Sequence, residues 1–153
     1  MAFEYHNIVI AVDGSKASDY AFQKAVDIAK RNHAKLIISH VVDTRVYSTI
    51  EAYDRHVSDR VQNDALELLK SYEERAERAG VENVVIDIEH GSPKVKIAKE
   101  VAPRHGADLI ICGATGMNAV ERFFIGSVSE HITRYAKVDV LVIRPEDDEK
   151  QKK

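Results

Sequence analysis

The sequence predicts an α/β fold, a three-layer α/β/α sandwich around a five-stranded parallel sheet with strand order 3-2-1-4-5. Short runs rich in valine and isoleucine alternate along the chain with longer segments whose apolar residues recur at helical spacing. The short runs are nearly continuous in apolar residues, which is typical of parallel strands buried on both faces. The length of 153 residues suits one domain, which we expect to span residues 1–145.

The first half of the chain contains two strand–helix pairs. Asn7–Val12 and Lys35–Val42 are β-branched runs of strand length. Between them, the apolar residues from Ser18 to about Asn32 fall on one helical stripe. A longer helix follows a polar stretch and ends near Ala79, because Gly80 readily adopts the left-handed conformation that terminates helices.

The second half of the chain repeats this pattern. Strands are expected at Asn83–Ile88 and Ala107–Gly113, again as apolar runs. The helix between them starts with Ser92 as N-cap and Pro93 at the first helical position. The missing N–H of proline costs nothing there, so this pair marks a helix start.

The chain closes with a short helix at Ser127–Tyr135 and a fifth strand at Val138–Arg144. We expect this strand at the edge of the sheet, where an uncapped apolar strand invites pairing with a second chain. Pro145 and the charged residues 146–153 follow, and we expect them to form a disordered tail.

The predicted strand order also predicts where a ligand binds. Open α/β sheets bind ligands outside the carboxyl ends of their strands, at the point where the strand order reverses. Here the reversal falls between the first strand, which ends at Asp13, and the fourth, which ends at Gly113. Asp13 also suits a local role, because an aspartate at this position can anchor an Asx-turn over "DGS".

A glycine-containing loop with the spacing G-x2-G-x9-G-S begins at this predicted crevice. We expect Gly113 and Gly116 to permit positive φ and to let a ligand approach the backbone closely. Gly126 directly precedes Ser127, which is the expected N-cap of the last helix.

The start of that last helix has two interpretations. With Ser127 as N-cap, the N–H groups of Val128, Ser129 and Glu130 lie unpaired at the positive end of the helix dipole and suit a phosphate group. Ser127 and Glu130 also form an S-x-x-E capping box, which stabilises a helix start without any ligand. The two interpretations are compatible.

Composition argues against several classes of protein. Hydrophobic residues make up 44% and charged residues 31%, and a net charge of −3 argues against a general nucleic-acid binder. No apolar run approaches the roughly 18–20 residues of a membrane span, and no signal peptide is visible, so we expect a cytoplasmic protein without a membrane partner. Cys112 is the single cysteine and fits a small buried hydrophobe better than a nucleophile. The histidines lack metal-ligand spacing, and His40 is expected to be a hydrogen-bonded core residue.

Three blocks of sequence together resemble the universal stress protein family of the ATP-binding type. They are the loop from Gly113 to Ser127, "AVDGS" at Ala11–Ser15 and "SHVVD" at Ser39–Asp43, and the similarity extends over about residues 5 to 145. The resemblance implies a Rossmann-like, adenine nucleotide α-hydrolase-like fold. It also implies bound ATP, a divalent cation (Mg²⁺ or Mn²⁺) at the phosphates, and a homodimer made through the strand Val138–Arg144.

The resemblance further implies roles for individual residues. Ala11 and Val12 would line the adenine pocket, and Val41 would offer its backbone to the adenine edge. Asp13 would meet the ribose or the metal, and no other side chain is dedicated to a metal. The residues expected around the ribose and phosphates are Gly113, Ala114, Thr115, Gly116, Gly126, Ser127, Val128 and Ser129.

Three classes of function follow from these patterns. The favoured class is a nucleotide-dependent stress-response or signalling protein. An adenine-nucleotide-processing enzyme of the α-hydrolase type would need an S-G-G-x-D-S-like loop, which "VDGSKAS" matches only loosely. A ligand-free interaction module of the receiver type would need an aspartate at the end of the third strand, where Glu89 stands. We expect no catalytic residues and at most a slow ATPase, because the phosphate loop has no lysine. Its Glu121 and Arg122 lie among the nine residues between Gly116 and Gly126, where nothing in the sequence fixes their positions.

Overall fold

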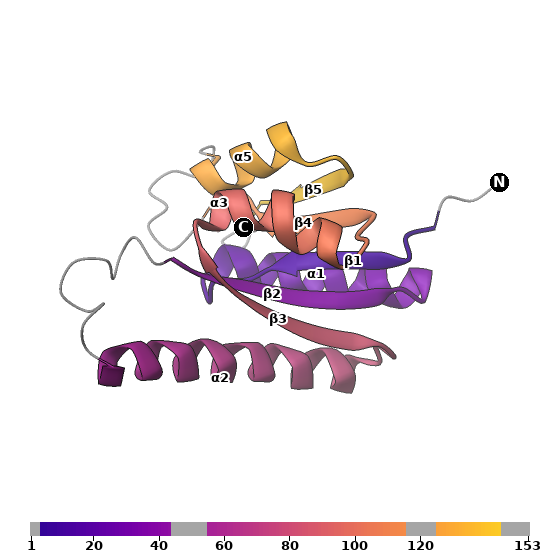
Figure 1. The fold of residues 1–153 in the computed structure, drawn as a ribbon. Coiled ribbons are helices and arrows are strands. Elements are labelled where there is room, and N and C mark those ends of the chain that lie inside the picture. The colour runs from indigo at the N-terminus through magenta and orange to yellow at the C-terminus, as the bar shows by residue number, and fades with distance from the viewer. Residues whose placement is uncertain (1–3, 44–54, 116–124, 145–153) are drawn as a thin grey trace, which may run out of the picture.

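The computed structural model describes residues 4–43, 55–115 and 125–144, which build one parallel sheet with the order β3-β2-β1-β4-β5. Figure 1 shows the sheet between two layers of helices. The predicted fold class and strand order are therefore confirmed. The strands are β1 (Asn7–Ala11), β2 (Lys35–Asp43), β3 (Val84–Gly91), β4 (Leu109–Gly113) and β5 (Asp139–Ile143).

Helices cover both faces of the sheet. One layer contains α1 (Lys16–Asn32) and α2 (Arg55–Ala79), and the opposite layer contains the remaining helical segments. Those segments are α3 (Pro93–Lys96), the π-helical turn η2 (Ile97–Val101), α4 (Ala102–Arg104) and α5 (Ser127–Tyr135). This arrangement confirms the predicted three layers.

Strand β1 shows why the apolar runs are continuous. Successive strand residues point to opposite faces of a sheet. Ile8 and Ile10 pack toward α1 and α2, whereas Val9 packs toward η2 and α5, and all three side chains are fully buried. A run without polar residues is the consequence of a strand with two apolar faces.

The helical segment after β3 differs from the single helix that the sequence predicts. Pro103 has no N–H, and its ring crowds the carbonyl four residues earlier, which is Lys99. The turn before it widens, so that the N–H of Ala102 donates to the carbonyl of Ile97, five residues back. Gly106, with φ of 60°, then ends the segment.

Strand β5 lies at the edge of the sheet, as predicted, and among the described residues it pairs with β4 alone. Leu141 on this strand is 36% exposed. No helix in the described ranges is long and apolar enough to cross a membrane. Pro145, the charged tail and residues 116–124 of the glycine loop lie outside the described residues.

Candidate functional site

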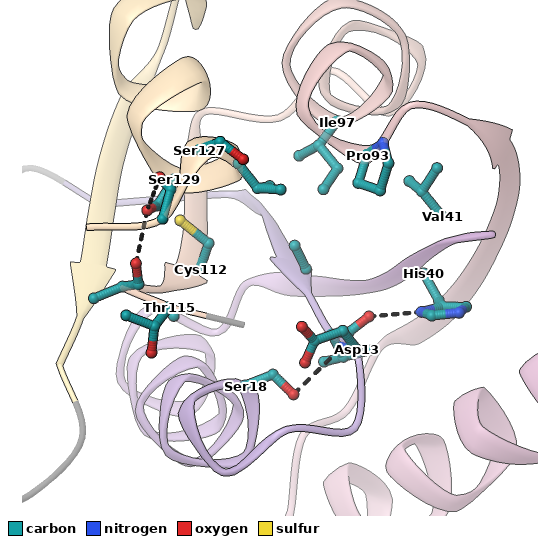
Figure 2. Close-up of a pocket in the computed structure, with 16 residues that line it drawn as sticks. Asp13, Ser18, His40, Val41, Pro93, Ile97, Cys112, Thr115, Ser127 and Ser129 are labelled. Carbon is teal, nitrogen blue, oxygen red and sulfur yellow. Dashed lines mark hydrogen bonds between the residues drawn. The ribbon is translucent and has the colours of Figure 1, made fainter. Parts of the chain in front are cut away.

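A pocket of about 380 Å³ opens at the carboxyl ends of β1, β2 and β4, where the strand order reverses. Figure 2 shows Thr115, Ser127 and Ser129 on one side of it and Val41, His40 and Pro93 on the other. Eleven of the twelve residues singled out in the sequence line this pocket, and the twelfth, Gly116, lies outside the described residues. The eleven are Ala11, Val12, Asp13, Val41, Gly113, Ala114, Thr115, Gly126, Ser127, Val128 and Ser129.

Asp13 stands at the turn that joins β1 to α1. Its Oδ1 accepts the N–H of Ser15 at 2.9 Å, which is the Asx-turn that the sequence allowed. Ser15 in turn caps α1, because its Oγ accepts the N–H of Ser18 at 3.1 Å. Gly14 occupies the left-handed region, with φ of 82°. Asp13 is exposed and also lines the pocket, so the local turn does not withdraw this residue from it.

The backbone of β2 continues past the end of β1. The N–H of Leu36 donates toward β3, to Asn83 at 2.9 Å, whereas the carbonyl of Ser39 accepts from Val12 on the β1 side at 2.9 Å. In parallel strands the N–H and C=O of one residue face the same side, and the next residue faces the other. Val41, two residues beyond Ser39, therefore presents both groups on the β1 side, where the last paired residues are Ala11 and Ser39.

His40 is half-buried and lines the pocket beside Val41. Its Nδ1 lies 2.7 Å from the carbonyl oxygen of Val12. A carbonyl can only accept, so Nδ1 carries the proton and donates. The predicted hydrogen bond of this histidine is confirmed, but its predicted place in the core is wrong, because the half-buried residue lines the pocket beside Val41 at the strand end.

The two ends of the glycine loop are tied together through one carbonyl. Ala114 O accepts the N–H of Gly126 at 2.7 Å and the hydroxyl of Ser129 at 2.9 Å. The same hydroxyl lies 3.1 Å from the carbonyl of Gly126. Because these acceptors take the hydroxyl proton of Ser129, its backbone N–H is the donor that remains for an anion.

The start of α5 is shifted by one residue from the prediction. Gly126, with φ of −68° and ψ of 163°, is the N-cap, and its carbonyl accepts the N–H of Glu130 at 3.0 Å. Ser127 is therefore the first helical residue. The predicted capping box is wrong, because a residue inside the helix cannot cap it, and Glu130 instead accepts from Arg134 Nη2 at 2.9 Å.

This shift changes which N–H groups are available at the helix start. The N–H groups of Ser127, Val128 and Ser129 precede the first intrahelical bond and have no partner within the helix. The predicted donors were Val128, Ser129 and Glu130. Ser127 takes the place of Glu130, whose N–H already donates to Gly126. All three residues line the pocket at the positive end of the helix dipole.

The loop glycines Gly113 and Gly126 lack the positive φ that we expected at Gly113 and Gly116. Gly113 does not have positive φ, and a Cβ on it would lie 2.9 Å from the backbone carbon and oxygen of Ala17. This glycine thus makes room for the first turn of α1. Gly126 also has negative φ, and a Cβ there would have its nearest neighbour at 3.5 Å, which is ordinary contact. The expectation of positive φ is wrong for Gly113 and untested for Gly116.

Five pocket residues were not predicted to line it, namely Ser18, His40, Pro93, Ile97 and Cys112. Cys112 is 3% exposed, and burial raises the pKa of its thiol to about 12. The interpretation of Cys112 as a buried hydrophobe is confirmed. Among the described lining residues, Asp13 is the one carboxylate, and no lysine or arginine is present. The described ranges contain no cluster of three or more side chains suited to a metal ion.

We expect native Cys112 to react with iodoacetamide at least about 100-fold more slowly than the same cysteine in unfolded protein at about pH 8. The thiolate is the nucleophile, and a thiol with a pKa of about 12 supplies almost none of it at that pH. Mass spectrometry of protein labelled in buffer and in concentrated urea measures the ratio. Equal rates in the two conditions would contradict the burial of Cys112 and the raised pKa of its thiol.

The fold and the pocket define a class of protein, a doubly wound α/β domain with a crevice at the carboxyl ends of its strands, between the end of β2 and the start of α5. The sequence model that describes the universal stress protein family matches residues 4–144. The chain belongs to the universal stress protein family.

Individual relatives agree with this assignment. A Staphylococcus haemolyticus protein that bears the family name is 54% identical over 143 residues, which cover 94% of this chain and 87% of that protein. The solved structure of universal stress protein UspA from Lactobacillus plantarum is 33% identical, with a TM-score of 0.82, and covers 94% of this chain and 100% of its own. A universal stress protein solved in complex with cAMP is 26% identical, with a TM-score of 0.70 over 94% of this chain and 100% of its own.

Proposed function

We propose that this universal stress protein binds one ATP per chain in the pocket and acts as a nucleotide-dependent stress-response protein. The observation that carries the proposal is that two sets of backbone hydrogen-bonding groups lie on opposite sides of one pocket. On one side stands the backbone edge of Val41, beyond the last β1–β2 pair in the described part of the chain, and on the other stand the N–H groups of Ser127, Val128 and Ser129. A pocket of about 380 Å³ is of the size that small-molecule ligands occupy.

The edge of Val41 suits adenine. Adenine presents an amino donor beside a ring-nitrogen acceptor, which complement a backbone C=O and N–H on one residue. Guanine presents the opposite pattern at the same edge, an oxygen acceptor beside an N–H donor. Pro93 and Ile97 add apolar surface on this side of the pocket, where a flat base would pack. The cAMP complex of a family member supports an adenine nucleotide as the ligand class.

The start of α5 suits phosphate groups. Three N–H groups without intrahelical partners, together with the positive end of the helix dipole, are a general anion site. The carboxylate of Asp13 would then meet the ribose hydroxyls or a Mg²⁺ or Mn²⁺ ion carried by the phosphates. In this proposal the base lies toward β2 and the phosphates lie toward α5.

Isothermal titration calorimetry with magnesium tests the proposal. We expect ATP to bind with one site per chain and GTP to bind at least about tenfold more weakly, because the donor–acceptor order at Val41 opposes guanine. Absence of ATP binding would contradict the function. Equal affinities for ATP and GTP would contradict the role of Val41.

We expect ATP to be held rather than turned over, at well below the 1–100 per second that is typical of kinases. Backbone N–H groups that bind ground state and transition state alike do not accelerate chemistry. The described pocket residues include no basic side chain to stabilise a transferring phosphate, and Glu130 already pairs with Arg134. A steady-state phosphate-release assay measures this. Turnover within that range, lost on replacing Asp13, would identify an enzyme instead.

We also propose that the chain forms a homodimer through β5. Leu141 is a large apolar side chain, 36% exposed, on an edge strand. Val140 and Val142 are half-buried against the opposite face, so changing them would disturb the core as well. We expect Leu141→Lys to convert a dimer into monomers in multi-angle light scattering. A wild-type protein that is monomeric at micromolar concentration would refute the dimer, and a dimeric Leu141→Lys variant would refute the β5 interface.

A further inference from the structure

A chain of hydrogen bonds links the pocket to the seam between α1 and α2. The N–H of Asp13 donates to Ser18 Oγ at 3.3 Å, and the hydroxyl of Tyr72, on α2, lies 3.3 Å from the same oxygen. Tyr72 also donates to Asp19 Oδ1. Ser18 lies in the first turn of α1 and also lines the pocket.

The direction of each proton in this chain follows from the groups present. A carboxylate only accepts, so the Tyr72 hydroxyl donates its single proton to the hydrogen bond with Asp19. Tyr72 can then only accept from Ser18, whose proton is shared between Tyr72 and the carbonyl of Ser15 at 3.2 Å. Burial and the hydrogen bond to Asp19 raise the pKa of Tyr72 to about 12, so the phenol keeps its proton at neutral pH. Donation therefore runs one way, from the Asp13 amide to the Asp19 carboxylate.

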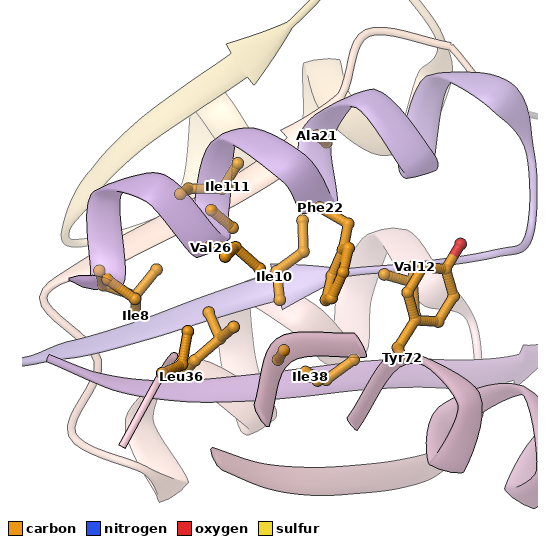
Figure 3. Close-up of a cluster of buried hydrophobic side chains, with 14 of the residues drawn as sticks. Ile8, Ile10, Val12, Ala21, Phe22, Val26, Leu36, Ile38, Tyr72 and Ile111 are labelled. Atoms are coloured by element: carbon orange, nitrogen blue, oxygen red, sulfur yellow. The ribbon is translucent and has the colours of Figure 1, made fainter. Parts of the chain in front are cut away.

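The far end of the chain is held in place by packing. Tyr72 is 2% exposed and packs against Phe22, with ring centroids 4.7 Å apart and the ring planes tilted by 58°. Figure 3 shows its ring in the core with the hydroxyl directed toward α1. Arg75 lies over both rings, 4.9 and 5.0 Å from their centroids, and reaches Asp19 at 3.6 Å. The hydroxyl of Tyr72 therefore has one fixed position.

We infer that Tyr72 is a positioning residue for the nucleotide pocket, which holds the Asp13 turn in its ligand-binding shape through Ser18. Hydrogen bonds that run in one direction along a chain polarise one another. Ser18 Oγ therefore accepts more strongly from the Asp13 amide when the Ser18 hydroxyl donates to Tyr72. The inference rests on the proposed nucleotide function for its role in binding. It extends that function to α2, which contributes no residue to the described pocket lining.

The test compares Tyr72→Phe with a matched control, Tyr5→Phe. Both variants remove a hydroxyl that donates to an aspartate, but Tyr5 bonds Asp139 at 2.7 Å, beside the amino end of β5 and away from the pocket. In ligand-free protein we expect Tyr72→Phe to speed hydrogen exchange of the Asp13 amide at least about fivefold relative to that of Ile10 in the core. We expect ATP affinity to fall about 3- to 10-fold. Tyr5→Phe should leave both unchanged.

A merely structural role of Tyr72 would change the exchange of Asp13 and Ile10 by the same factor. An Asp13 amide that keeps its ratio to Ile10 in Tyr72→Phe overturns the inference, whether or not ATP binds. A wild-type protein that binds no ATP contradicts the proposed function. The hydrogen exchange of the Asp13 amide then still tests whether Tyr72 positions the turn. Ser18→Ala provides a second variant, and adding Tyr72→Phe to it should have no further effect on the Asp13 amide if the two act in one chain.

Discussion

Replacing Ser127 with proline should weaken ATP binding by about 10- to 100-fold and leave the fold intact. Ser127 is the first residue of α5, where proline is well tolerated because the N–H that it removes has no partner within the helix. Gly126 before it is extended, with ψ of 163°, which is the conformation that a residue preceding proline prefers. The variant therefore removes one donor from the proposed phosphate site, and hydrogen bonds to charged groups contribute about 1.5–3 kcal/mol.

The matched control for this prediction is Ser127→Ala, which removes the hydroxyl and keeps the N–H. We expect its ATP affinity to stay within about threefold of the wild type, because the backbone donor carries the interaction. Adenosine, which has no phosphate, should bind both variants equally well. Calorimetry with ATP and adenosine measures all four combinations. Wild-type ATP affinity in Ser127→Pro would show that the phosphates do not lie on α5.

Replacing Gly113 with alanine should destabilise the protein by about 1–3 kcal/mol, the usual cost of overpacking. The new Cβ would lie 2.9 Å from the backbone carbon and oxygen of Ala17, and backbone cannot move aside as a flexible side chain can. The first turn of α1 would have to shift away from β4, which also displaces the wall of the pocket. Urea denaturation followed by circular dichroism measures the change in the free energy of unfolding.

The control for Gly113 is the same substitution at Gly126. Its φ is −68°, and the nearest neighbour of an added Cβ is Ala114 O at 3.5 Å. Alanine fits this conformation and restricts the unfolded chain, but it is a poorer N-cap than glycine, so we expect these two effects to offset each other and to leave the free energy of unfolding within about 1 kcal/mol of the wild type. Equal destabilisation at both positions would contradict the assignment of Gly113 to helix packing.

Much of this architecture could be predicted from the sequence because it depends on patterns that are local in the chain. Apolar runs such as "NIVIAV" and the helical stripes between them define five strands and their helices. Parallel connections then restrict the order to a few arrangements, and the crevice follows from the order. Asp13 and Ser127, at a strand end and a loop end, were therefore found at the pocket, and Val41 was placed there by the family resemblance.

What the sequence could not predict depends on distances between elements. Gly113 packs closely against the first turn of α1, which only the position of Ala17 reveals. Ser18 and Ile97 reach the pocket from helical segments, away from the strand ends and loop ends that the sequence singles out. The one-residue shift at α5 arose because serine and glycine are both favourable N-caps, and only the Glu130 N–H shows which carbonyl it uses.

The position of the nucleotide is tested most directly by titrating ¹⁵N-labelled protein with ATP and magnesium and following each backbone amide. We predict that the resonances of Val41, Thr115 and Ser127 to Ser129 move together and saturate at one ATP per chain. Those of Tyr5 and Asp139, which lie away from the pocket, should stay in place. Shifts confined to the Tyr5 and Asp139 region, or no shifts at millimolar ATP, would contradict the account.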